Sequence, residues 1–125
     1  EENAMTSTYT LEPFKYCSFE SASYRTEEFA LFDRKYCSFV RRMCKNNGWE
    51  VARCTHGHFE TSFVLRNDNG TYVNILGNDV RSFNWYKRFC VRICDGPNDY
   101  RGKTNTWCAL ETLEETIQRL FRSGN

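Results

Sequence analysis

The sequence lacks an excess of charge of either sign. Seventeen basic residues face sixteen acidic ones, which gives a net charge of +1. A uniformly basic surface would attract nucleic acid everywhere, and a strongly acidic one would imitate it. The balance therefore argues against both of these classes of protein, and it leaves room for a local basic face.

Long apolar runs are also missing. No stretch approaches the roughly 20 apolar residues needed to cross a bilayer, and the N-terminus is acidic and polar, unlike a signal peptide. We therefore expect a cytoplasmic protein without membrane association. The seven cysteines are an odd number, which favours reduced thiols over a disulfide framework.

Recognisable catalytic and cofactor motifs are absent from the sequence as well. It has no phosphate-binding glycine pattern, no Gly-x-Ser-x-Gly, no His-Glu-x-x-His and no Cys-x-x-Cys. The turn at 67–70 departs from a calcium loop, because Leu65 and Leu76 stand where Asp and Glu ligands are required. We predict no cofactor, and the sequence favours a non-catalytic role without deciding whether the protein is an enzyme.

What the sequence does contain is enough apolar bulk for one core. Hydrophobic residues make up 40% of the 125 residues and aromatic residues 16%, which is typical of a single folded domain. Residues 1–12 show no pattern and are expected to be a tail, either disordered or left over from cloning. Residues 13–125 are expected to form one globular α+β domain.

Two helices are predicted, one on each side of the strands. The first spans about 26–45, where apolar side chains recur at steps of three and four and Asn46-Asn47-Gly48 can end the helix. The second spans about 113–122. The segment 112–115 resembles a capping box, in which the Thr112 side chain would accept from a backbone amide of the first turn.

Between the helices, residues 49–110 predict an antiparallel sheet of four to five strands in a meander of hairpins. The central hairpin, 58–77, turns at 67–70. The first strand should place Trp49, Val51 and Arg53 on one side, and the alternation over 82–94 predicts one long strand. Both helices should pack on one face of the sheet, so that the opposite face stays open to solvent or to a partner.

The open face is the first candidate site. Tyr and Arg are enriched in protein interfaces, and they also serve as stacking platforms for single-stranded nucleic acid. An ordinary solvated sheet face is the alternative. The candidate binding residues are Arg66, Tyr72, Asn74, Tyr86, Arg88 and Arg92.

The second candidate site is the alternating set Cys54, His56 and His58. On a continuous strand these three side chains would share one side at steps of about 6.6 Å, which is short enough for neighbours to bind one metal ion. A bend at Gly57 and the lack of an obvious fourth ligand weigh against this interpretation. A cysteine nucleophile with His56 or His58 as its base is a further alternative.

Three functional hypotheses follow. The leading one is a small non-catalytic interaction module whose partner is another protein. The second is binding of single-stranded nucleic acid through the Tyr/Arg face. The third is a thiol or metal site at Cys54, His56 and His58. The sequence predicts no particular oligomeric state.

Overall fold

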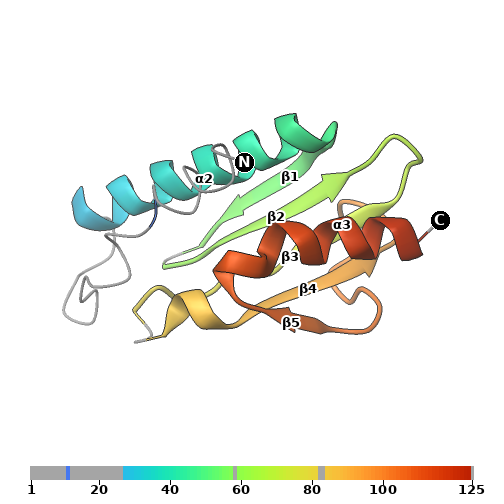
Figure 1. Cartoon of the computed structure of the whole chain (residues 1–125). Coiled ribbons are helices and arrows are strands. Elements are labelled where there is room, and N and C mark those ends of the chain that lie inside the picture. Colours follow the sequence, from blue (N-terminus) through green and yellow to red (C-terminus); the bar gives the residue numbers. More distant parts are fainter. Residues whose placement is uncertain (1–10, 12–26, 58, 82–83, 125) are drawn as a thin grey trace.

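The structure is a computed structural model that describes residues 11, 27–57, 59–81 and 84–124. It confirms the predicted α+β fold, with a helix, a five-stranded antiparallel sheet and a second helix in chain order (Figure 1). The strand order is β1-β2-β3-β4-β5, so each strand pairs with its neighbour in the sequence. Such a meander needs only short connections.

The elements have the following bounds: α2 (Glu27–Asn47), β1 (Glu50–His56), β2 (Thr61–Arg66), β3 (Tyr72–Ile75), η2 (Trp85–Lys87), β4 (Phe89–Cys94), β5 (Thr106–Cys108), η3 (Leu110–Thr112) and α3 (Leu113–Ser123). The two η elements are short 3-10 helices. Figure 1 shows α2 alongside β1 and α3 across β3 and β4.

Helix α2 packs on the sheet through an aromatic stripe. The ring centroid of Tyr36 lies 5.6 Å from that of Phe63 on β2, and the Phe32 centroid lies 5.0 Å from that of Trp85. The helix ends at Asn47, and the next residue, Gly48, has a φ of 73°, a left-handed conformation that favours glycine. The predicted stop is therefore confirmed, two residues beyond the predicted helix boundary.

Helix α3 covers the other half of the same face. Ile117 and Phe121 are buried, and the Phe121 ring lies 5.0 Å from Trp49. The predicted capping box is wrong, because the Thr112 hydroxyl donates to the Ala109 carbonyl at 3.3 Å and accepts no amide of α3. The reason is η3, which already places Thr112 at the end of a helical turn.

The core lies between the helices and two rows of cross-strand partners. All but three members of these rows are buried, and most are fully inaccessible to solvent. Each large apolar side chain buried in this way contributes about 1.5–3 kcal/mol. One row is Val51, Leu65, Val73 and Ile93, and the next is Cys54, Phe63, Ile75 and Val91.

Two predictions about the strands are wrong. Strand β4 begins only at Phe89, and Tyr86 lies in η2 because its neighbour Trp85 turns into the core. In β1, Val51 pairs with Leu65 but Arg53 pairs with Val64, so a β-bulge at Ala52 sends Val51 and Arg53 to opposite faces.

Most of the predicted tail lies outside the described residues. Within it Leu11 is described, and its side chain is fully buried in the core cluster. In the described part of the chain, no helix combines the length and the apolar character that a membrane span requires.

Candidate functional site

The face of the sheet opposite the helices is the first candidate site. Strand alternation and register place one continuous row of side chains across four strands on this face. A second row on the same face lies two residues farther along β2, β3 and β4. The first row is Arg53, Val64, Asn74 and Arg92, and the second is Glu50, Arg66, Tyr72 and Cys94.

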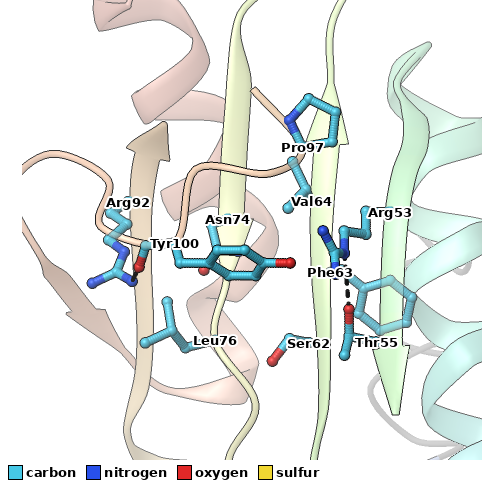
Figure 2. A pocket seen from close by; sticks show the side chains of 10 residues that line it. All are labelled: Arg53, Thr55, Ser62, Phe63, Val64, Asn74, Leu76, Arg92, Pro97 and Tyr100. Atoms are coloured by element: carbon cyan, nitrogen blue, oxygen red, sulfur yellow. Dashed lines mark hydrogen bonds between the residues drawn. The ribbon is translucent and has the colours of Figure 1, made fainter. Parts of the chain in front are cut away.

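A groove of about 270 Å³ lies over the first row. Figure 2 shows Asn74 at its centre, with Arg53 on one side and Arg92 on the other. Tyr100 and Pro97 enter the groove from the 95–103 loop. The groove is therefore polar at both sides and is partly covered by an aromatic ring. It is lined by Arg53, Thr55, Ser62, Phe63, Val64, Asn74, Leu76, Arg92, Pro97 and Tyr100.

Both guanidinium groups of the groove are held by neutral oxygens. Arg53 donates to the Thr55 hydroxyl at 3.2 Å and to the side-chain oxygen of Asn98. Arg92 donates to the Asn105 side chain at 3.1 Å and to the Tyr100 carbonyl at 2.7 Å. Within the described residues neither is part of an ion pair, so both positive charges are left without a carboxylate.

The 95–103 loop is ordered by one aspartate. The Asp99 carboxylate accepts the backbone amides of Asp95 at 2.9 Å and of Arg101 and Gly102 at 3.1 Å. These bonds, led by that from Asp95, lower the pKa of Asp99 from its ordinary value. The loop presents Tyr100 with 66% of its surface exposed, and the Arg53 guanidinium lies 4.9 Å from the Tyr100 ring centroid.

The structure gathers most of the predicted binding residues on this face. Arg66, Tyr72, Asn74 and Arg92 lie in its two rows. By contrast, Tyr86 is half-buried in η2 and packs against the core.

Arg88, which was also predicted, lies next to the far edge of the sheet. It precedes β4, and its guanidinium lies 4.1 Å from the ring centroid of Trp107 on β5. Half of the Trp107 surface is exposed. This pair adds a second cation–π contact to the open face, besides that of Arg53 with Tyr100.

Sequence reasoning missed Arg53, Tyr100 and Trp107 as parts of this face. The bulge at Ala52 turns Arg53 toward it, and the fold of the 95–103 loop brings Tyr100 over it. Trp107 pairs with Cys90 of β4. The one usable signal was a Tyr in a Gly/Pro-containing loop between two strands, because binding residues are often carried on such loops.

The second candidate site is a cluster of two thiols and an imidazole. Its ligand atoms, from Cys37 on α2 and from Cys54 and His56 on β1, all lie within 4.8 Å of one another. The Cys54 Sγ lies 3.5 Å from His56 Nε2. Of the predicted set, the structure joins Cys54 and His56, whereas His58 lies outside the described residues.

Burial raises the pKa of both thiols in this cluster. It raises the pKa of Cys37 to about 12, with a further contribution from the Asp33 carboxylate, and it also raises the pKa of Cys54. Neither thiol therefore has the lowered pKa of an activated nucleophile.

Comparisons with family models, curated proteins and solved structures found no match to this chain.

Proposed function

We propose that this protein is a small binding module that recognises an acidic segment of another protein through its open sheet face. The observation that carries the proposal is the pair of guanidinium groups, Arg53 and Arg92, on either side of one groove without a carboxylate partner in the described residues. An aspartate or glutamate of a partner would complete a charge-assisted contact there.

The size of the groove suits a protein side chain. Its volume of about 270 Å³ is below the roughly 300–1,000 Å³ of most pockets for small molecules. Val64 and Leu76 supply apolar surface, while Asn74 and Ser62 supply polar atoms. Such a groove fits one or two side chains of an extended segment, with the carboxylate near the arginines.

The hydrogen bonds around the arginines favour binding without rearrangement. Arg92 is held by Asn105 and by the Tyr100 backbone, and Arg53 by Thr55 and Asn98. Side chains that are already ordered lose less conformational entropy when a partner binds. The exposed rings of Tyr100 and Trp107 extend the contact surface with residue types that dominate interface energetics.

The cellular setting forms part of the proposal. The six cysteines in the described part of the chain are all free thiols. Free thiols persist in the reducing cytoplasm, so we propose that the protein acts there.

Single-stranded nucleic acid is the second candidate partner. The same two exposed rings could stack with bases, and the arginines could contact phosphates. One face of each ring is already covered by a guanidinium, Arg53 on Tyr100 and Arg88 on Trp107. The overall charge of +1 also supplies little of the general attraction on which such binding depends.

The test is capture of partners from source-cell lysate on the immobilised 125-residue chain, with and without nuclease. The informative variant is Asn74→Glu, which places a carboxylate between the two arginines and should remove at least nine-tenths of the captured protein. The matched control is Arg42→Glu on the exposed side of α2, which changes charge more but should retain capture.

Three results would count against a protein partner at this face. Equal capture by Asn74→Glu and the wild type would exclude the groove. Loss of capture with Arg42→Glu alone would move the interface to α2. Disappearance of binding after nuclease treatment, together with a steep fall in affinity as salt rises, would select nucleic acid instead.

A further inference from the structure

The cluster of Cys37, Cys54 and His56 has the spacing of a metal site. In a tetrahedral zinc site the metal–sulfur and metal–nitrogen bonds of about 2.3 and 2.0 Å place neighbouring ligand atoms about 3.5–3.8 Å apart. The 3.5 Å between Cys54 Sγ and His56 Nε2 already has this length. Since no two ligand atoms of the cluster are more than 4.8 Å apart, the tetrahedral spacing requires a closure of at most about 1 Å.

The imidazole is oriented by a carboxylate behind it. His56 Nδ1 lies 2.9 Å from the Asp33 carboxylate, which can only accept, so Nδ1 donates there. In the neutral ring Nε2 then carries the lone pair, and it lies 3.5 Å from Cys54 Sγ. The second Asp33 oxygen accepts the hydroxyl of the buried Thr61. A carboxylate behind the ring in this way is the usual support of a metal-binding histidine.

Two local features of the fold assemble the cluster. Asp33 and Cys37 are one helical turn apart on α2, so they share a side of the helix. The bulge at Ala52 turns Cys54 and His56 toward α2, whereas Arg53 and Thr55 line the groove of the open face. Without the bulge, the strand register would place Cys54 and His56 on the open face and Arg53 on the covered face. One irregularity of β1 therefore brings the cysteine and histidine to α2 and also brings Arg53 to the groove.

We propose that Cys37, Cys54 and His56 bind a borderline-soft divalent cation of the zinc class. Two thiolates and one imidazole are ligands that Zn²⁺ and Co²⁺ accept in tetrahedral sites. The His56 side chain is 55% exposed, so the fourth position faces solvent and can be filled by water or by an external ligand. The bound ion would join α2 to the outer strand β1. This proposal is independent of the proposed partner at the open face.

The second thiol distinguishes this site from a nucleophilic triad. Cys54, His56 and Asp33 alone have the order of nucleophile, base and orienting acid. A nucleophile needs no second cysteine in contact with it, whereas a metal site gains a ligand from Cys37. Metal binding therefore uses every group of the cluster, and the triad leaves Cys37 without a role.

The test is titration of the reduced, chelator-treated 125-residue chain with Co²⁺. We expect one equivalent to produce the intense visible bands of tetrahedral cobalt and a near-ultraviolet thiolate-to-cobalt band, and Zn²⁺ to displace both. Zn²⁺ should also raise the melting temperature by several degrees, because it binds only the folded chain tightly. Circular dichroism of each variant would verify that it is folded.

Variants assign the ligands and their support. Cys37→Ser, Cys54→Ser and His56→Ala should each lose the tetrahedral spectrum, whereas Cys108→Ser, a half-buried thiol outside the cluster, should keep it. Asp33→Asn should keep the spectrum but bind about 10–100-fold more weakly, since Asp33 acts through His56.

Several outcomes would overturn the proposal. The first is a reduced wild-type protein that shows no stoichiometric cobalt spectrum. The second is an unchanged spectrum in Cys37→Ser. The third is a Cys54-specific covalent reaction with an electrophilic probe that depends on His56 but proceeds unchanged in Cys37→Ser, since that pattern belongs to a nucleophile.

Discussion

The two faces of the sheet are organised by different forces. On the covered face, aromatic side chains pack against one another, as Tyr36 of α2 packs on Phe63 and Phe89. On the open face, Arg53 and Arg92 hold their neighbours by directed hydrogen bonds. Apolar burial is strong and non-directional, whereas exposed polar contacts add little stability but fix geometry. Stability is therefore concentrated on the first face, and the proposed recognition on the second.

The largest expected effect separates two adjacent residues of β2. Phe63 points into the core and is fully inaccessible, and Val64 lies beneath the groove of the open face with 4% of its surface exposed. Phe63→Ala should lower the free energy of unfolding by about 3–5 kcal/mol through the cavity it leaves. Val64→Ala should cost only about 1–2 kcal/mol, because it removes fewer buried methyl groups. Urea denaturation would measure both, and equal losses would contradict the division between the faces.

Two glycines with left-handed backbones, one beside the groove and one after α2, allow the next comparison. Gly102 has a φ of 67°, and a Cβ there would lie 2.6 Å from Arg92 Cδ, whereas Gly48, with a φ of 73°, has open space around it. Gly48→Ala should cost about 1 kcal/mol through backbone strain alone. Gly102→Ala should cost about 2 kcal/mol, because Arg92 must also move.

Binding provides the second measurement for this pair. Gly102→Ala should lose the captured partner, since Arg92 is displaced from the groove, and Gly48→Ala should keep it. If both variants lost the same stability and bound alike, the packing of Gly102 on Arg92 would have no part in shaping the groove.

The sequence predicted the fold well where a pattern extends over many residues. The aromatic stripe of α2 and the apolar positions of α3 repeat often enough to define each helix within two residues. Single-residue events were not predictable. The bulge at Ala52 and the turn of η2 at Trp85 leave no repeating pattern. Trp85 turns inward to pack against Phe32 of α2, a contact between distant segments that no local pattern encodes.

The candidate sites were predicted only in part for the same reason. Asn74 and Arg92 follow from strand alternation, but Arg53 reaches the groove only because of the bulge. Cys37 joins Cys54 and His56 from another element, and no local spacing connects them. The one available signal was Asp33 and Cys37, a polar pair one turn apart beside the apolar stripe of α2.

The smallest expected effect concerns a thiol on the covered side of the sheet. Cys44 is 3% exposed, and burial, partly offset by Arg41, raises the pKa of its thiol to about 12. In the unfolded chain a cysteine titrates near pH 8.5. The folded protein therefore keeps this proton while the unfolded chain loses it, and ionisation favours unfolding as pH rises above about 8.5.

We therefore expect the free energy of unfolding of the wild type to fall more steeply with rising pH than that of Cys44→Ala. The wild type should lose about 0.7 kcal/mol relative to Cys44→Ala between pH 8 and pH 9, and the two pH profiles should run parallel below about pH 7, where the thiol is protonated in both states. Urea denaturation of both proteins across this range measures the difference, and the other cysteines cancel because both chains carry them. Parallel pH profiles would mean that the Cys44 thiol reaches water in the folded protein, and that the covered face is less closed at this position than its packing indicates.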